Sequence, residues 1–456
     1  MEVINSFPGY EFVQFGEDGH SHNMYRGEDV GFGGYVYAEP GMYGRTICFD
    51  VAGMHPASIR ALNCLGDYTK NFGDLVDARL AIKHKDFEKA KTMFGGKLAP
   101  YLDDPTQAKA LSSALKIAIN SVFGLTAAKF DNPFRDSRNL NNQVALRGAL
   151  FMVNLKHEIQ DRGFQVIHCK TDSVKVVNPS PELCDFIMEY GQKYGYQFEI
   201  EHIFERICLV NNAVYIAKLA DDDPESPGEW TATGKQFAIP YVYKTLFTKE
   251  PVNTTDMCET FSVKSALYLD MNESLPDVTE YERELNKLET KYKKGLLSDM
   301  TFEKESSRLI KTISEGHNYK FVGKVGEFCP VKPGKGGGVL CREQNGNFYA
   351  ATGTTGYRWV ESEMIMKKLQ EKETVIDEET GDKKEVLKAE AFSEIEDIID
   401  RSYYNKLVDD AVDTISEFGD FERFVSDDPY PVQDPMPNFM NIPEDAPEEL
   451  PWDPVN

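Results

Sequence analysis

The sequence predicts an α+β fold that combines an antiparallel sheet, a two-helix element and a larger C-terminal region of helices and short strands. Residues 45–51, RTICFDV, are β-branched and aromatic, as in a buried strand. Residues 164–178 contain strand-like runs on both sides of a polar tripeptide, which is typical of a β-hairpin. Between these segments, residues 68–126 have the length and the capping residues of two helices.

Length and composition indicate a globular protein of two or three domains, because the chain has 456 residues and a hydrophobic content of 41%. It contains neither a run of eighteen apolar residues nor an N-terminal signal pattern. We therefore expect no membrane partner and a cytoplasmic protein, in the host cytoplasm if it is viral. None of the eight cysteines forms a CxxC pair, which excludes a zinc ribbon and predicts free thiols.

The net charge of -25 argues against nucleic-acid binding, since phosphate groups are neutralised by Lys and Arg. The acidic residues are concentrated at one end, however. Residues 361–456 contain 28 Asp and Glu against 9 Lys and Arg, which leaves a net charge of only -6 for residues 1–360. A nearly neutral body of this kind can still bind a duplex through a groove lined with basic residues.

The two-helix element is predicted as a hairpin. Its first helix spans residues 73–93 and ends at Gly95 and Gly96. The second begins at Asp104-Pro105-Thr106-Gln107, with an acceptor at the N-cap and proline in the first turn. A short loop containing glycine makes the two helices antiparallel.

The remaining elements follow from the same patterns. We expect helices at 141–162 and 182–195, strands within 203–218 and 229–247, a helical hairpin at 279–313 broken at Gly295, a β-rich unit at 319–360 and helix at 361–425. The last segment, 426–456, has eight prolines and no Lys or Arg, and is predicted to be disordered.

Two aspartates stand where a metal site could form. Asp50 lies at the end of the strand at 45–51, and Asp172 lies at the tip of the hairpin at 164–178. Carboxylates at adjacent strand ends are suitable ligands for two divalent cations about 4 Å apart, as phosphoryl transfer requires. The alternative is that Asp50 caps the following helix and Asp172 forms an Asx-turn, which is the commoner role of isolated aspartates.

The helix hairpin presents a polar face that suits a nucleotide. Arg79 and Lys83 are four residues apart, and Lys116, Asn120 and Phe123 follow helical spacing on the second helix. Three cations, an amide and a ring suit a triphosphate and a base pair. A solvated charged face is the alternative, although the Asn, Ser and Gly of AINSVFGLTAA interrupt a helix at some cost.

These segments resemble the family B DNA polymerases. DVAGMHPA at 50–57 is similar to motif A, KIAINSVFG at 116–124 to motif B, and HCKTDS at 168–173 to motif C, in the same order. Arg79 and Lys83 match the R-x-x-x-K helix between the first two motifs. The resemblance covers about residues 30–250, and TGKQF at 233–237 is similar to bacteriophage members.

The resemblance implies a right-hand polymerase fold with an antiparallel palm sheet, two-helix fingers and a C-terminal thumb-like region. The domains would be palm at 1–67, fingers at 68–126, palm at 127–250, a thumb-like and C-terminal region at 251–425, and an acidic tail at 426–456. The activity would be template-directed nucleotidyl transfer from dNTPs to a primer 3′-hydroxyl on primer–template DNA. The implied cofactor is Mg²⁺, as two ions, with Mn²⁺ as a possible substitute.

The same resemblance implies roles for individual residues. Asp50 and Asp172 would be catalytic and would bind both metals, with the Val51 carbonyl as a further ligand. The nucleotide would be bound by His55, Arg79, Lys83, Lys116, Asn120 and Phe123. The DNA would be contacted by Lys170, Thr171, Tyr215 and Lys218.

Three departures from the family pattern leave alternatives open. His55 replaces the motif A aromatic that excludes a ribose 2′-hydroxyl, Lys170 replaces the first Asp of motif C, and Ala213 replaces the lysine of the K-x-Y element that contains Tyr215. No D-x-E exonuclease motif precedes motif A, so a separate exonuclease subunit is a possible partner, and the acidic tail could dock that subunit or a sliding clamp. The alternatives are a catalytically silent polymerase-fold subunit that binds DNA or a partner polymerase, and an RNA-synthesising primase or reverse transcriptase.

Overall fold

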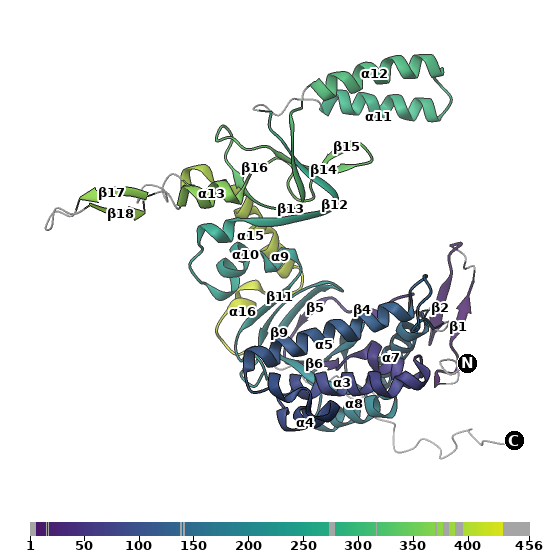
Figure 1. Cartoon of the computed structure of the whole chain (residues 1–456). Helices are drawn as coiled ribbons and strands as arrows, with labels where there is room; N and C mark the ends of the chain where they lie inside the picture. The colour runs from purple at the N-terminus through teal and green to yellow at the C-terminus, as the bar shows by residue number, and fades with distance from the viewer. Residues whose placement is uncertain are drawn as a thin grey trace, which may run out of the picture. The chain divides into compact units, whose positions relative to one another are not determined.

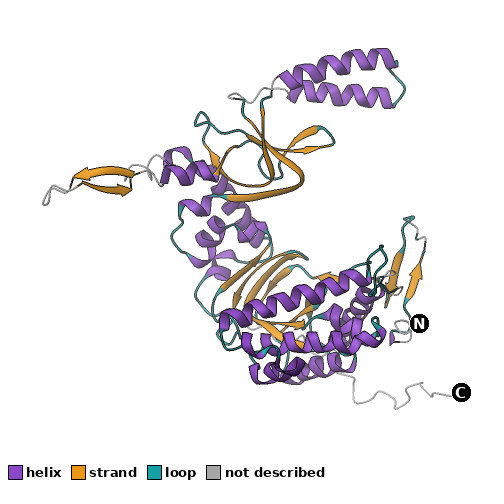
Figure 2. Cartoon of the chain, in the orientation of Figure 1, coloured by secondary structure: helices purple, strands orange, loops and turns teal. Residues whose placement is uncertain are grey.

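The computed structural model contains helices and antiparallel sheets, so the α+β class is confirmed (Figures 1 and 2). It describes residues 6–14, 16, 18–136, 139, 142–272, 279–315, 317–369, 372–376, 383–387 and 395–431. The chain forms two compact units. Unit 1 comprises residues 1–237 and 414–456, and unit 2 comprises residues 238–413. The first segment of unit 1 therefore ends at residue 237, before the predicted boundary at 250, and unit 1 also includes the C-terminal residues 414–456.

Unit 1 is built on an eight-stranded antiparallel sheet in the order β11-β10-β9-β6-β8-β7-β4, with β5 also paired to β9. Its strands are β4 (Val36–Ala38), β5 (Gly41–Tyr43), β6 (Thr46–Val51), β7 (Val166–Lys170), β8 (Ser173–Val177), β9 (Phe198–Asn211), β10 (Val214–Leu219) and β11 (Trp230–Thr233). The predicted strand at 45–51 is β6, in the centre of the sheet between β8 and β9. A separate three-stranded sheet contains β1 (Glu11–Val13), β2 (His22–Tyr25) and β3 (Glu28–Asp29).

Helices pack on this sheet and form the core of unit 1. The predicted helix at 141–162 is α7 (Gln143–Asp161), and the one at 182–195 is α8 (Pro181–Lys193). Phe151 of α7 and Phe49 of β6 are both 0% exposed and belong to one hydrophobic cluster. The short helix α2 (Met54–Ala61) follows β6 directly and packs against α7. The core thus fixes the end of β6, where Asp50 lies.

The two-helix element is present, but its first helix is broken. Helix α3 (Thr69–Lys83) ends before Lys85, which has a left-handed backbone with φ 61. Asp86 then caps the short helix α4 (Phe87–Thr92) by accepting a hydrogen bond from the Lys89 amide. The single helix predicted at 73–93 was therefore wrong, because a capping aspartate starts a new helix inside it.

The second helix, α5 (Pro105–Thr126), begins as predicted. The carboxylate of Asp104 accepts hydrogen bonds from the amides of Thr106 and Gln107. The hairpin at 164–178 is also confirmed as β7 and β8, with Thr171 and Asp172 between them. The strand prediction for 229–247 holds only for β11, because residues 235–248 form α9 (Lys235–Ala238), α10 (Pro240–Tyr243) and a π-helical turn (Lys244–Thr248).

Unit 2 contains a five-stranded antiparallel sheet in the order β15-β14-β12-β13-β16. Its strands are β12 (Glu259–Asp270), β13 (Tyr319–Val331), β14 (Val339–Gln344), β15 (Asn347–Ala350) and β16 (Arg358–Glu361). The predicted helical hairpin is present as α11 (Thr279–Lys293) and α12 (Asp299–Glu315), with Gly295 at φ 68 in the turn. Cys258 and Cys329 form a disulfide in this unit, so the prediction of free thiols was wrong for this pair.

The segment predicted as helix at 361–425 is only partly helical. It contains α13 (Ser362–Leu369), the hairpin β17 (Lys372–Ile376) and β18 (Lys383–Leu387), α15 (Arg401–Ser416) and α16 (Phe421–Val425). The chain then returns to unit 1, where the fully buried Arg206 donates hydrogen bonds to the carbonyls of Phe424, Ser426 and Asp428. Most of the tail predicted to be disordered, residues 432–456, lies outside the described residues. No helix of the described chain is long and apolar enough to cross a membrane.

Candidate active site

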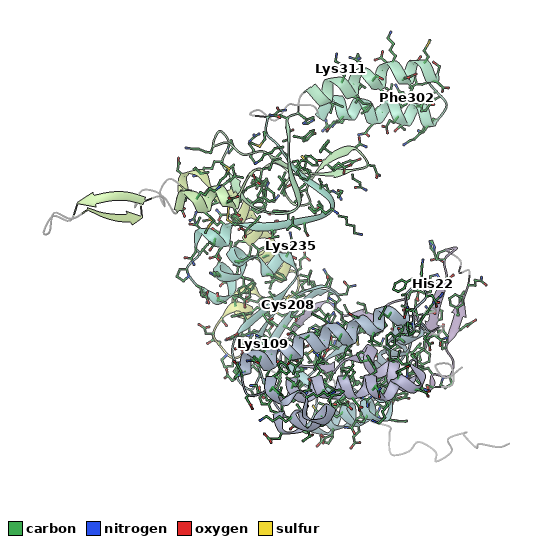
Figure 3. All side chains as sticks on the ribbon, in the orientation of Figure 1. His22, Lys109, Cys208, Lys235, Phe302 and Lys311 are labelled. Carbon is green, nitrogen blue, oxygen red and sulfur yellow. A yellow bond between two sulfur atoms is a disulfide. The ribbon has the colours of Figure 1, made fainter. Side chains whose placement is uncertain are left out.

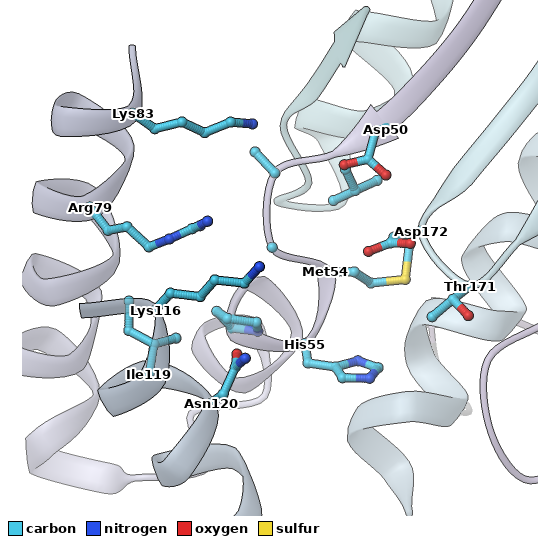
Figure 4. A pocket seen from close by; sticks show the side chains of 14 residues that line it. Asp50, Met54, His55, Arg79, Lys83, Lys116, Ile119, Asn120, Thr171 and Asp172 are labelled. Atoms are coloured by element: carbon cyan, nitrogen blue, oxygen red, sulfur yellow. The ribbon is translucent and has the colours of Figure 1, made fainter. Parts of the chain in front are cut away.

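The main chain places Asp50 and Asp172 on neighbouring strands. Asp50, near the end of β6, pairs in register with Ser173, the first residue of β8. The amide of Val51 donates a hydrogen bond of 2.9 Å to the carbonyl of Asp172. Two acidic residues that are 122 positions apart in the sequence therefore meet at the same end of two neighbouring central strands. Both side chains line the same pocket (Figure 4).

The hairpin that carries Asp172 is held in shape by the N-terminal part of the chain. Thr171 has a left-handed backbone with φ 58, and its amide donates a hydrogen bond of 2.8 Å to the carbonyl of Tyr35. Gly34 lies against the Thr171 side chain, where a Cβ atom would overlap the threonine. The close approach at Gly34 therefore requires glycine and fixes the turn before Asp172.

The two carboxyl groups are in an environment that disfavours their charge. Burial and, next, the charge of Asp172 raise the pKa of Asp50 to about 7. Burial also raises the pKa of Asp172. Glu201 of β9 adds further negative charge and acts in the same direction on both groups. Two neighbouring carboxylates with raised pKa values are a site that a cation would stabilise.

Opposite the carboxylates, the helix element contributes cations to the same pocket. Arg79 and Lys83 come from α3, and Lys116 and Asn120 come from α5 (Figure 4). The pocket has a volume of about 290 Å³. All the residues predicted on the polar helix face, except Phe123, line it. The structure thus brings these side chains together with Asp50 and Asp172.

Lys83 has a carboxylate partner that the sequence did not predict. Its Nζ lies 2.6 Å from Oε2 of Glu199, and Nε2 of His84 lies 2.6 Å from Oε1 of the same side chain. Burial opposes the charge of Glu199, but hydrogen bonds from Lys83 and the charges of Lys83 and His84 hold its pKa below the usual value. Glu199 pairs in register with Asp50. An alignment of β9 with β6 would therefore have placed Glu199 beside Asp50.

His55 lies on the floor of the pocket and is stacked on Phe123. The ring centroids are 4.6 Å apart and the planes are inclined by 21°. Phe123 therefore packs against the ring of His55 and does not itself line the pocket. Burial lowers the pKa of His55. Its buried Nδ1 atom has no hydrogen-bond partner among the residues that the structure describes.

A second cavity, of about 320 Å³, adjoins this pocket at the carboxylates. Asp50 and Asp172 line this cavity too, together with Lys170, Thr171 and Tyr215. Three of the four predicted DNA-contacting residues therefore lie in one place. Lys218 does not line the cavity, because its ammonium group lies 3.8 Å from the carboxylate of Glu205.

The second cavity also contains two charged residues that the sequence analysis missed. Lys175 is 5% exposed, and its Nζ lies 3.5 Å from Nδ1 of His168 and 5.2 Å from the ring centre of Tyr215. Burial and the charge of Lys175 lower the pKa of His168 to about 4. Glu201 is the second missed residue. The polar Lys175 between valines in SVKVV was the available signal, since residues 173 and 175 share a strand face.

The carboxylate pair has donor atoms of the type that magnesium prefers. Within the described ranges, no group of three or more His, Cys, Asp or Glu side chains is arranged to hold a metal. Magnesium is commonly bound by one or two carboxylates, with water and substrate phosphates as the other ligands. Asp50, Asp172 and the Val51 carbonyl are oxygen donors of this hard type. The donor set is therefore suitable for Mg²⁺ or Mn²⁺.

Comparisons with known proteins give matches among solved structures. No family model and no curated protein sequence matches the chain. Among solved structures, the chain is similar to the family B DNA polymerase from the hyperthermophilic archaeon Pyrobaculum calidifontis, with 14% sequence identity and a TM-score of 0.35. The match covers 54% of this chain and 38% of that polymerase, so the chain spans well under half of its length. At this TM-score, the similarity adds nothing about the residues of the pocket.

Proposed function

We propose that the chain is a DNA-directed DNA polymerase that transfers nucleotides from dNTPs to a primer 3′-hydroxyl. The observation that carries this proposal is the pocket in which Asp50 and Asp172 face the cations of α3 and α5. Carboxylates on one wall and cations on the other suit a substrate that brings both phosphates and divalent metal. The right-hand palm, fingers and thumb-like assignment belongs to the same proposal.

The carboxylates would hold the metals, and the cations would hold the phosphates. Bound Mg²⁺ supplies Lewis-acid activation of the attacking hydroxyl and neutralises the departing pyrophosphate. Asp50 and Asp172 would hold the metals at the same end of β6 and β8, with the Val51 carbonyl as a further ligand. Arg79 and Lys116 bind phosphate oxygens, where arginine can form two parallel hydrogen bonds. Lys83 must break its ion pair with Glu199 and contact the phosphate when the nucleotide binds.

The remaining residues would orient the base, the sugar and the primer. Asn120 lies beside His55, and the stacked pair of His55 and Phe123 forms a platform beneath the nucleotide. Lys170, Thr171 and Tyr215 line the second cavity, where the primer end would lie. Lys218 stays a prediction as a DNA contact, as do a separate exonuclease subunit and a sliding clamp as partners.

Primer extension tests the proposal directly. The chain is incubated with a labelled primer–template, dNTPs and either Mg²⁺ or Mn²⁺, and the products are separated by length. We expect addition of the templated nucleotide, which requires the metal and is lost with chelator. Failure of the chain to extend the primer with either metal, under conditions in which it binds the DNA, would contradict a catalytic function.

One observation favours a second candidate, a catalytically silent subunit that binds DNA or a partner polymerase. Lys170 is exposed and lines the second cavity together with Asp172, so a cation lies near one of the carboxylates that would hold the metals. An unpaired positive charge close to a metal site repels divalent ions. Lys170→Asp separates the candidates: activity that appears only in this variant identifies the silent subunit, whereas activity of the unaltered chain identifies the polymerase.

A further inference from the structure

A row of aromatic rings lies on one face of the sheet of unit 2, away from the core of that sheet. Leu267 and Leu269 of β12 are 0% and 3% exposed, and Tyr268 lies between them in the strand. Because successive side chains of a strand point to opposite faces, Tyr268 points away from the two leucines. Its register partner in β13 is Phe321, which is 62% exposed.

The rings are in continuous contact across three strands. His317 stacks on Tyr319 with centroids 5.0 Å apart, and Tyr319 stacks on Phe348 of β15 at 3.8 Å. Phe348 meets Tyr268 edge to face at 4.9 Å, and Tyr268 meets Phe321 in the same way at 5.4 Å. We call these five residues the ring row. It begins at His317 and ends at the exposed ring of Phe321.

One end of the ring row is fixed by a buried carboxylate. Asp270 is 4% exposed, and its Oδ2 lies 2.5 Å from Nδ1 of His317. Its Oδ1 accepts a hydrogen bond of 2.7 Å from the amide of Asn318. Because the first ring is held in this way, the stacked rings after it are preorganised. A preorganised surface loses little conformational entropy on binding.

Basic side chains gather next to the exposed end of the ring row. Tyr268 pairs in register with Phe321, and Lys324 follows Phe321 three residues later in β13. The bulge between Ser262 and Leu267 contains Lys264 and lies opposite Lys324. Lys264 and Lys324 are exposed and have no ion-pair partner within the part of the chain that the structure describes. Strands β12 and β13 thus expose cations in a chain whose net charge is -25.

We propose that the ring row is a binding site for single-stranded nucleic acid. Exposed rings stack on bases, and nearby cations neutralise the phosphates that join them, which is the combination found in sequence-independent single-strand binding. The bases of a duplex are paired and cannot reach a flat ring, so the site selects unpaired strands. Phe321 is the stacking residue, and Lys264 and Lys324 contact the phosphates. The site is formed within unit 2 and does not depend on the polymerase activity.

Binding of short oligonucleotides to the full chain tests this site. Fluorescence anisotropy is measured with labelled oligothymidylate and oligouridylate of about 20 nucleotides, with chelator and without dNTPs, and with a duplex of the same length. We expect Phe321→Ala and Phe321→Leu each to weaken single-strand binding about tenfold, since leucine keeps the apolar bulk but not the ring. Phe321→Trp is expected to retain binding, and stacked bases should quench its emission.

Matched variants in the same unit give the controls. Met300→Ala removes a side chain that is 79% exposed in α12, and Lys311→Ala removes a cation from the same helix. Neither should change binding, whereas Lys264→Ala with Lys324→Ala should weaken it and reduce its salt dependence. Equal effects of the control variants, tighter binding of the duplex, or full binding by Phe321→Ala would each overturn the proposal.

The outcome is distinguishable from that of the primer-extension experiment. If the chain binds oligothymidylate through Phe321 but extends no primer, the single-strand site is supported and the proposed polymerase function is contradicted. If the chain extends primers while Phe321→Ala binds single strands as well as the unaltered protein, only the single-strand site is contradicted. The comparison of oligothymidylate with oligouridylate shows whether the strand is DNA or RNA.

Discussion

Lys83 and Glu199 form an ion pair of 2.6 Å between helix α3 and strand β9, beside the carboxylate of Asp50. The side chains are 41% and 22% exposed, so the pair is accessible to an incoming ligand. In the proposed reaction, the triphosphate must replace Glu199 as the ion-pair partner of Lys83. Glu199 thus holds Lys83 in place when the nucleotide is absent, and it competes with the triphosphate for Lys83 when the nucleotide binds.

Removal of either partner should therefore change nucleotide affinity in opposite directions. We expect Lys83→Ala to raise the KM for dNTP about tenfold, because a charged hydrogen bond to phosphate is lost. Glu199→Gln should lower the KM a few-fold, about 1 kcal/mol or less, because the competing carboxylate is gone. Lys116→Ala should resemble Lys83→Ala. Steady-state kinetics with a saturating primer–template measures all three.

The control for this series is Lys70→Ala, which removes a cation from α3 that is 84% exposed and paired with Asp74. It should leave the KM unchanged. If Lys83→Ala and Lys116→Ala weakened only the affinity for DNA, the two lysines would not be part of the nucleotide site.

Asp172→Asn should abolish extension without loss of DNA binding. The substitution keeps the size of the side chain but removes the charge that would hold the metals, so we expect kcat to fall by about three orders of magnitude or more. Primer–template affinity, measured by anisotropy, should change less than about twofold. Asp161→Asn, at a position that is 65% exposed in α7, is the control. Full activity of Asp172→Asn would refute the catalytic role.

The raised pKa of Asp50 predicts that its charge destabilises the metal-free protein. A free aspartate has a pKa of about 3.9, whereas the folded value is about 7. The folded state therefore holds the proton more tightly, and stability falls as the pH rises from about 4 to about 7. Above pH 7 the loss is complete. Because the group is partly exposed, we expect Asp50→Asn to stabilise the protein by about 1–2 kcal/mol at pH 8 in chelator.

Thermal unfolding across the pH range measures this effect. The advantage of Asp50→Asn should shrink toward pH 5, and saturating Mg²⁺ should reverse it, since only the aspartate form gains from binding the metal. Asp67→Asn alters an exposed aspartate and should show neither trend. An advantage that does not depend on pH would show that the carboxyl group is not in the environment described here.

His55→Tyr should increase discrimination against ribonucleotides. A histidine ring is smaller than tyrosine, and its buried Nδ1 can exchange a hydrogen bond with a sugar hydroxyl. We expect the ratio of kcat/KM for dNTP over rNTP to rise about tenfold or more in His55→Tyr, as the larger ring meets the 2′-hydroxyl. His20→Tyr, at an exposed position, is the control. An unchanged ratio would show that His55 does not contact the sugar.

Local signals in the sequence were sufficient for the elements that carry the candidate site. The cap at Asp104 and the proline after it fixed the start of α5, and the polar tripeptide at 170–172 marked the turn between β7 and β8. These signals depend on residues within one turn of each other, so they can be recognised without the fold. Where a local cap was overlooked, as at Asp86, the prediction was wrong.

Other features depended on contacts between distant residues. Glu199 becomes the partner of Lys83, which is 116 positions away, only because β9 pairs with β6 beside α3. The hairpin itself pairs Lys175 with His168, whereas the burial of Lys175 depends on the pairing of β8 with β6 inside the sheet. The hairpin of β17 and β18 forms where a helix was predicted. Both strands consist of residues that also occur in helices, so composition alone did not indicate the hairpin.

The sequence by itself determined which side chains could perform phosphoryl transfer and on which local elements they stand. Only the tertiary structure decided that Asp50 and Asp172 share one pocket with Arg79, Lys83 and Lys116, and that the rings of β12, β13 and β15 form one row. The physical reason is that capping and turn formation are short-range, whereas strand pairing and burial depend on the whole chain.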